Sequence, residues 1–251
     1  AYVRYLHWIF GAFTGDLGNS ASYGVPVSGL IAERLQVTLP LALMAVTIAV
    51  IMGVLLGVAA AARPRRLQDR AASVFAQIGI AVPDFWFGIL MILLFSTRLQ
   101  WFSAGGFPGW GQPLTALKSL LLPAIALALP QAAVLTRVTR SAVLDVSEED
   151  FIRTARAKGL TRQRVLWRHA VRNALVPIVT IVGLQFSFLI AGAVLVENVF
   201  NLPGIGRLAY QSLAQRDLVV IRSVAMLFAG LVILVNFLVD LSYFWIDPRL
   251  R

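Results

Sequence analysis

The residues with the strongest chemical character lie in one basic stretch, residues 147–177, which reads SEEDFIRTARAKGLTRQRVLWRHAVRNALVP. Long uncharged segments flank it on both sides. Cationic side chains on a water-exposed, folded segment suit recognition of a soluble partner, where they set docking rate and register. The pattern therefore predicts a docking site between two membrane spans.

The same stretch carries signals for a helix, a glycine turn and a second helix. Ser147 followed by Asp150 resembles a capping box, so we expect a helix to begin there. Gly159 suits a left-handed helix end, and Thr161 is placed to cap a second helix over residues 162–173. The first helix has a small apolar face, formed by Phe151, Ile152, Ala155 and Ala157. The alternative is an unstructured basic loop on anionic headgroups, which explains neither the caps nor the glycine.

Groups for catalysis or metal binding are sparse. The chain has no Cys, and its two histidines, His7 and His169, are far apart without neighbouring ligands. A phosphate-binding Gly-x4-Gly-Lys-Ser/Thr loop is absent, since the sequence context of Lys118 and Lys158 fits none. We expect no catalytic residue, no metal and no cofactor in this chain, with any ATP and Mg bound by partners.

The composition predicts an all-α polytopic membrane protein. Of 251 residues, 59% are hydrophobic and 14% are charged, with mean hydropathy +0.79, whereas soluble domains carry about 25% charged residues. Five segments are long and apolar enough to cross a bilayer: residues 37–62, 71–97, 119–136, 174–196 and 223–246. The net charge of +10 would suggest nucleic acid in a soluble protein. Here the positive charges are concentrated in the loops between spans, so we expect a lipid partner and no nucleic acid.

The distribution of Lys and Arg predicts the orientation. With five spans, 15 of the 22 Lys and Arg residues fall on the side that holds residues 63–70, 137–173 and 247–251. This side is therefore cytoplasmic. We expect an external segment over residues 1–36, a transmembrane domain over 37–246 with a cytoplasmic element at 147–173, and a cytoplasmic tail at 247–251. An external N-terminus without a preceding signal predicts a further span before Ala1. The alternative is insertion without a signal.

The motif from Arg153 to Gly159, RTARAKG, resembles the cytoplasmic coupling motif of bacterial ABC importer permeases of the dipeptide, oligopeptide and nickel family. Ala155 and Gly159 match the general pattern, whereas Arg153 and Thr154 stand where it has Glu and Ala. Pro177 lies about five residues late, as is usual in this branch. Further resemblances cover the chain, at GDLG (15–18), IAERL (31–35), PDFWFG (83–88), ENVFNLPGIG (197–206) and DPR (247–249). They resemble the first of the two paired permeases.

This resemblance implies a type I importer transmembrane domain in a bacterial inner membrane. Its partners would be a second homologous permease, two cytoplasmic ATPases and an external solute-binding protein. The implied cargo is peptides, with nickel, glutathione or opine-type solutes as alternatives. The residues implied in ATPase coupling are Arg153, Ala155, Arg156, Ala157, Lys158 and Gly159. A membrane enzyme would need ligating or paired acidic residues in spans, and an ATP-independent secondary transporter would need inverted repeats and buried charges.

Polar residues inside the spans are candidates for the translocation path. Asp84 lies mid-span beside Pro83 and Trp86, and all three are candidates, since intramembrane carboxylates are often functional. It either lines the path or caps a half-helix that begins after Pro83. Gln185 is a second candidate, although uncharged polar residues in spans more often join helices.

Overall fold

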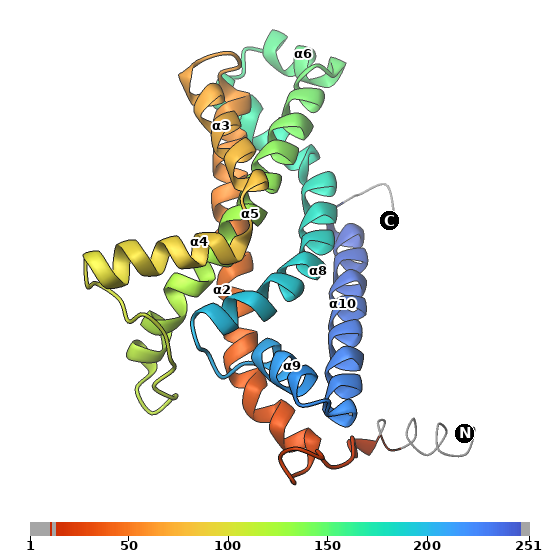
Figure 1. Cartoon of the computed structure of the whole chain (residues 1–251). Helices are drawn as coiled ribbons and strands as arrows, with labels where there is room; N and C mark the ends of the chain where they lie inside the picture. Colours follow the sequence, from red (N-terminus) through yellow and green to blue (C-terminus); the bar gives the residue numbers. More distant parts are fainter. Residues whose placement is uncertain (1–10, 12–13, 247–251) are drawn as a thin grey trace.

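The computed structural model describes residue 11 and residues 14–246, and within this part every regular element is helical (Figure 1). The predicted tail, residues 247–251, and most of the first thirteen residues lie outside the described part. In chain order the elements are α2 (Val27–Ala62), α3 (Leu67–Ala81), α4 (Asp84–Met91), the π-helical η1 (Ile92–Arg98), α5 (Pro113–Ser147), α6 (Asp150–Ala157), α7 (Arg162–Val165), the π-helical η2 (Leu166–Val171), α8 (Leu175–Val199), α9 (Ile205–Ala214) and α10 (Leu218–Ile246).

Four helices of the described part are long and apolar enough to cross a membrane, namely α2, α5, α8 and α10. If the bent pair formed by α3 and α4–η1 counts as one span, the described part has up to five. Two helices extend well beyond their predicted apolar cores: α2 has 36 residues and α5 has 35, about 54 and 52 Å at 1.5 Å per residue. Both therefore project beyond a hydrocarbon core of about 30 Å.

The second predicted span is not one straight helix. The axis turns by 103° between α3 and α4 (Figure 1). Proline has no N–H and holds the preceding residue in extended backbone, and Val82 (φ −102°, ψ 127°) and Pro83 (φ −63°, ψ 144°) are both extended. The span predicted over residues 71–97 is therefore a broken one, and the half-helix expected after Pro83 is α4.

Small residues allow α2 and α5 to pack closely along the centre of the molecule. A Cβ atom on Gly53 would lie 2.7 Å from Cβ of Leu135, and one on Gly57 would lie 2.6 Å from Cβ of Thr139. Without an aqueous driving force inside a bilayer, helices associate by such close packing of small residues. This seam forms the framework on which the other helices rest.

The end of the molecule that holds α9 is tied together by a buried carboxylate. Glu197, near the end of α8, is 0% exposed and accepts hydrogen bonds from Thr38 Oγ1 (2.6 Å) and the Arg207 N–H (3.0 Å). Thr38 Oγ1 in turn accepts from the Ile205 N–H at 2.8 Å. The carboxylate thus lies against the first turn of α9, where backbone N–H groups lack helical partners. A Cβ on Gly204 would lie 2.2 Å from this carboxyl group, so glycine is required for the approach.

A second carboxylate anchors the segment before α2. Asp217 Oδ2 accepts hydrogen bonds from Ser20 Oγ (2.6 Å) and the Ser22 N–H (3.0 Å). Its Oδ1 accepts from the Val220 N–H in the first turn of α10. Burial acts to raise the pKa of Asp217, but these donors outweigh it and hold the pKa below its usual value. The segment before α2 is thereby joined to the start of α10.

Candidate functional site

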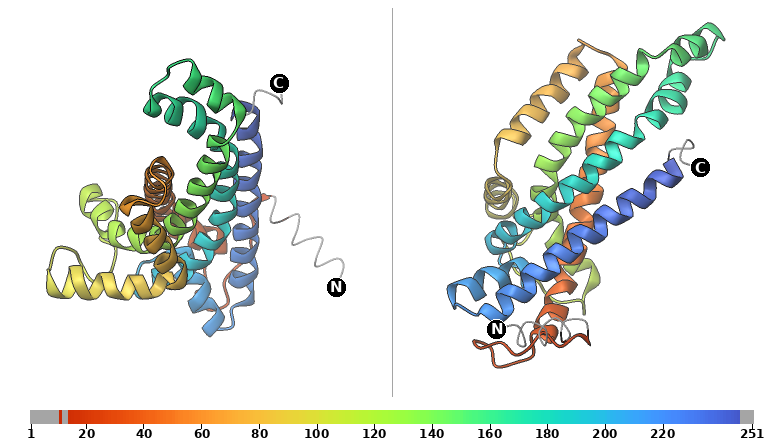
Figure 2. Two further views of the ribbon diagram at one scale, coloured as in Figure 1. Left: turned by 90° about the horizontal axis from the view of Figure 1, so that it is seen from above. Right: turned by 90° about the vertical axis from the view of Figure 1, so that its right-hand side faces the viewer.

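The predicted docking element forms a hairpin at the end of the molecule opposite α9 (Figures 1 and 2). We call it the α6–α7 hairpin, which comprises residues 150–171, that is, α6, the turn at Gly159, α7 and η2. Its first helix does not begin with the expected capping box. Helix α5 continues to Ser147, whose hydroxyl donates to the Val143 carbonyl of its own helix at 2.6 Å. Glu149 is the cap residue of α6, and its side chain makes no capping bond.

The predicted left-handed turn is confirmed at Gly159, where φ is +80°. The Gly159 N–H donates to the Arg156 carbonyl at 3.0 Å, and the Leu160 N–H donates to the Ala155 carbonyl. No atom lies within 4 Å of a Cβ built on Gly159. The position therefore favours glycine because of its backbone conformation alone.

The second half of the hairpin begins at the predicted cap. Thr161 Oγ1 accepts from the Arg164 N–H at 3.4 Å, and the helix then widens into η2. The expectation of one regular helix over residues 162–173 therefore holds only in outline, since a π-helical segment occupies its centre. Arg162 ties the hairpin to α2, because its guanidinium donates to the Ala62 carbonyl at the end of that helix.

One face of α6 is buried against the spans. Ile152 is 0% exposed and Ala155 is 7% exposed, and both belong to an apolar cluster that unites the hairpin with α2, α5 and α8. The buried members are Val58, Ala61, Leu135, Ala142, Val143, Ile152, Ala155, Val165, Ala170, Val171, Ala174 and Ile178. Ala155 was expected among the residues that face a partner. It faces the chain's own core instead, because the apolar stripe of α6 must be covered by the spans.

The opposite face of α6 is exposed and carries Arg153 and Ala157, while Arg156, at the edge of the buried face, and Lys158, just after the helix, are exposed as well. Its one ion pair joins Arg153 Nη1 to Asp150 Oδ1 at 3.2 Å, with both side chains largely exposed. Such a pair adds little stability and leaves the cations accessible. The hairpin therefore presents a charged surface to the outside and an apolar surface to the spans.

Asp84 occupies the break in the bent span. Its Oδ1 accepts from the Phe85 N–H at 3.0 Å. The cap residue of α4 is Pro83, and the helix has no side-chain capping bond, so Asp84 contributes an acidic side chain to the first turn rather than the expected cap. A Cβ on Gly192 would lie only 1.9 Å from Asp84 Oδ2, so α8 approaches the carboxylate with no side chain between them. Pro83 and Trp86, its neighbours, are exposed. Whether Asp84 also lines a path stays a prediction.

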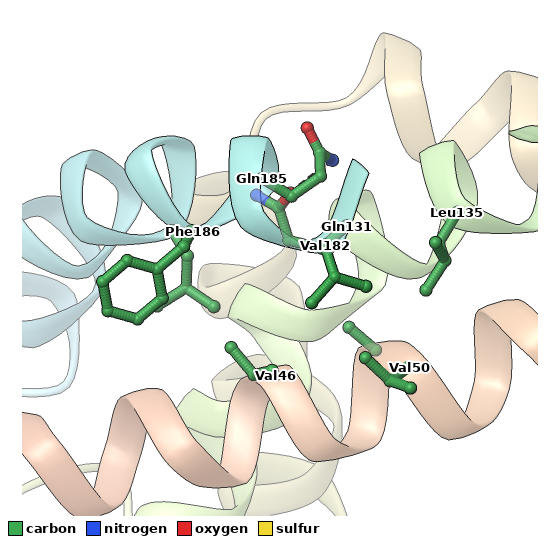
Figure 3. Close-up of a pocket in the computed structure, with 9 residues that line it drawn as sticks. Val46, Val50, Gln131, Leu135, Val182, Gln185 and Phe186 are labelled. Atoms are coloured by element: carbon green, nitrogen blue, oxygen red, sulfur yellow. Dashed lines mark hydrogen bonds between the residues drawn. The ribbon is translucent and has the colours of Figure 1, made fainter. Parts of the chain in front are cut away.

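Gln185 is engaged with another helix. Its Nε2 donates to Gln131 Oε1 of α5 at 2.6 Å, beside a small cavity whose walls include Val46 and Phe186 (Figure 3). The bond joins α5 to α8 in the middle of both helices. This matches the role of a polar residue between spans, and its role as a path residue is untested.

Sequence reasoning missed the polar contacts that join distant elements. Arg140 of α5 binds Asp69 of α3 through two bonds, Nε to Oδ1 at 2.5 Å and Nη2 to Oδ2 at 3.0 Å. Asp69 also accepts from the Arg65 N–H in the preceding turn. Asp69 and Glu197 are acidic residues at the edges of apolar runs. This position indicates that each needs a polar partner but does not indicate which residue the partner is.

The chain resembles known transport proteins along nearly all of its length. The family model described as "Binding-protein-dependent transport system inner membrane component" matches residues 53–251. A putative peptide transport system permease protein of Brucella abortus is 46% identical over 250 residues, which cover 99% of this chain and 80% of that protein. The oligopeptide transport system permease protein AppB of Bacillus subtilis is 42% identical over 254 residues, covering 100% of this chain and 80% of that protein.

A further relative is the dipeptide transport system permease protein DppB of Escherichia coli, which is 40% identical over 274 residues, covering 100% of this chain and 81% of that protein. Among solved structures, a chain of the inward-facing MetNI methionine ABC transporter has a TM-score of 0.71 at 19% identity, covering 87% of this chain and 97% of that chain. At this identity the likeness supports the fold alone. The chain is a multi-pass membrane protein that belongs to the family of binding-protein-dependent transport system inner membrane components.

Proposed function

We propose that this chain is the permease subunit of an ATP-driven importer, and that it forms half of a translocation path for peptides by alternating access. The cargo is supported by the relatives, whose names describe peptide, oligopeptide and dipeptide permeases at 40–46% identity. Membership of a binding-protein-dependent family supports an external solute-binding protein as the source of the cargo.

The observation that carries the proposal is the two-faced α6–α7 hairpin. Its exposed face carries Arg153, Arg156 and Lys158, while Ile152 is buried among residues of α2, α5 and α8. A partner that moves α6 would therefore move three spans with it, because a close-packed apolar cluster transmits displacement rather than absorbing it. This is the property that a coupling element needs.

The energy source in this proposal is supplied by two ATPase subunits that dock on the hairpin. The chain itself contains no phosphate-cradling loop. A second permease completes the path. Broad exposed apolar surfaces on α8 and α10, including Phe188 and Phe237, suit contact with that subunit and with lipid.

Cross-linking tests the docking surface, with a matched control two residues away. A cysteine at Ala157, which is exposed, should cross-link to a co-expressed ATPase in an active complex. A cysteine at Ala155, which is buried against the spans, should not. Equal cross-linking at both positions, or none at Ala157, would contradict the docking proposal. ATP-dependent peptide uptake by the reconstituted complex tests the cargo in the same preparation.

The proposed orientation places the hairpin in the cytoplasm, at an inner membrane. A cysteine at Ala104, in the exposed loop before α5, should react with an impermeant reagent in intact cells. A cysteine at Arg66, in the turn between α2 and α3, should react only after the membrane is opened. Labelling of Arg66→Cys in intact cells would reverse the orientation.

A further inference from the structure

A large cavity lies beside the α6–α7 hairpin, at the end of α2. Its volume is about 720 Å³, and its walls come from α2, α5, α6 and the α7–η2 segment. Along α2 the wall changes from the apolar side chains of Leu55 and Val58 to the guanidinium of Arg63. The cavity is thus apolar toward the middle of the span and polar at its end.

The polar end is cationic. Three arginines from three separate elements line it, Arg63 after α2, Arg156 in α6 and Arg162 in α7, against one acidic residue, Glu148. Within residues 14–246, the side chains of Arg63 and Arg156 have no hydrogen-bond or ion-pair partner. Arg162 donates one bond to the Ala62 carbonyl, which leaves other guanidinium N–H groups for a ligand. Arginines in such a cluster favour a phosphate, which they bind with paired N–H donors.

The apolar end continues onto the outer surface of α2. Leu55 is 53% exposed and Ile51, one turn away on the same face, is 54% exposed. Trp167, at 51% exposure, also lines the cavity. Tryptophan at the end of a span is typical of the boundary between lipid and water. An occupant must therefore join an anionic head to an apolar chain, as a membrane lipid does.

We propose that this cavity binds the phosphate headgroup of an anionic phospholipid from the leaflet next to the hairpin, with an acyl chain along Ile51 and Leu55. Because Arg63, Arg156 and Arg162 belong to different elements, one phosphate among them would hold α6 and α7 against the end of α2. The lipid would thereby stiffen the hairpin, and the activity of the transporter would depend on the anionic lipid content of the membrane. This inference does not depend on which solute is carried.

The test uses the complete transporter with its partner subunits, and phosphatidylglycerol and phosphatidylcholine as probes. Native mass spectrometry measures which lipid is retained, and ATP hydrolysis is measured in discs of either composition. The wild type should retain phosphatidylglycerol preferentially. Arg63→Gln with Arg162→Gln should reduce that preference about 25-fold, at about fivefold for each arginine. Arg63→Gln alone, which keeps the bond from Arg162 to Ala62, should reduce it about fivefold.

The control removes two charges from the same turn without touching the cavity. Arg65→Gln with Arg66→Gln should change the preference less than twofold, because neither residue lines the cavity. Retention of phosphatidylglycerol by Arg63→Gln/Arg162→Gln at the wild-type level would overturn the proposal. Displacement of the lipid by millimolar inorganic phosphate would assign the site to a free anion instead.

Discussion

Replacing Ile152 by alanine should loosen α6 from the spans without altering the surface that α6 presents to a partner. Ile152 is 0% exposed, and the only other buried residue of α6 is Ala155. Isoleucine to alanine removes three carbons, each of which contributes about 0.8 kcal/mol when buried. With the cavity that remains, the cost is about 3 kcal/mol. The equilibrium for local detachment of α6 should therefore rise roughly 100-fold.

The consequence for function is uncoupling. A loosened α6 still offers Arg153 and Arg156 to the ATPases but moves the spans less, so peptide uptake should fall much further than ATP hydrolysis. Hydrogen exchange of residues 150–158 should accelerate in the same variant. The assay is the ratio of peptide transported to ATP hydrolysed in reconstituted vesicles, measured together with exchange.

Ile178→Ala is the matched control. Ile178 is 3% exposed and belongs to the same apolar cluster, but it lies on α8. That variant should lose comparable stability without faster exchange confined to α6. An unchanged transport ratio in Ile152→Ala, with exchange of α6 accelerated as expected, would refute the idea that this packing transmits the motion.

Three further predictions concern other positions. Gly159→Val should abolish uptake while Gly159→Asn largely preserves it, because asparagine tolerates φ +80° far better than a β-branched residue; membrane insertion of both is checked by blotting, and wild-type uptake by the valine variant would contradict the turn's importance. Asp217→Asn should lower the melting temperature at pH 7. The pKa of Asp217 is lowered on folding, so the stabilisation by its carboxylate is full above the unfolded pKa of about 3.9 and is lost as pH falls through the folded pKa. The melting temperatures of the two proteins should therefore converge in acid. A difference that persists in acid would exclude this linkage. Gly192→Ala should be destabilising alone but tolerated together with Asp84→Ala, because the new Cβ would lie 1.9 Å from Asp84 Oδ2. A double-mutant cycle of thermal stability should give a coupling energy of about 0.5–3 kcal/mol. Additive effects of the two substitutions would show that other shifts relieve this contact.

The parts of the structure that sequence predicts best are those set by local rules. The long uncharged runs predict α2, α8 and α10 because a bilayer core demands about 20 apolar residues. Gly159 and Thr161 predict the turn and the next helix because a left-handed backbone and an unpaired N–H each favour particular residues. These features require no knowledge of what lies nearby in space.

The parts that sequence misses are decided by tertiary contacts. Ser147 satisfies a capping pattern, yet it is the last residue of α5, since nothing in the local sequence stops that helix earlier. Ala155 fits an exposed motif as well as a buried stripe, and only the position of the spans shows which applies. The 103° turn at Pro83 depends on how α4 packs against α5 and α8. By contrast, Pro40, Pro123 and Pro130 lie within continuous helices. A proline in a span therefore predicts a weak point but not its angle.

The buried Glu197 also constrains how the protein is made. Its carboxylate bonds to Thr38, a residue 159 positions earlier, so α2 must wait for α8 before this end of the bundle can close. At about 5–20 residues per second, synthesis needs roughly 8–30 s to reach Glu197 after Thr38. The bond from Ser20 to Asp217 forms later still, because the two residues are 197 positions apart. During that interval Thr38 of α2 lacks its bond to Glu197, so a ribosome that stalls before α8 leaves a product in which this end of the bundle is open, and quality-control proteases can distinguish it from the finished subunit.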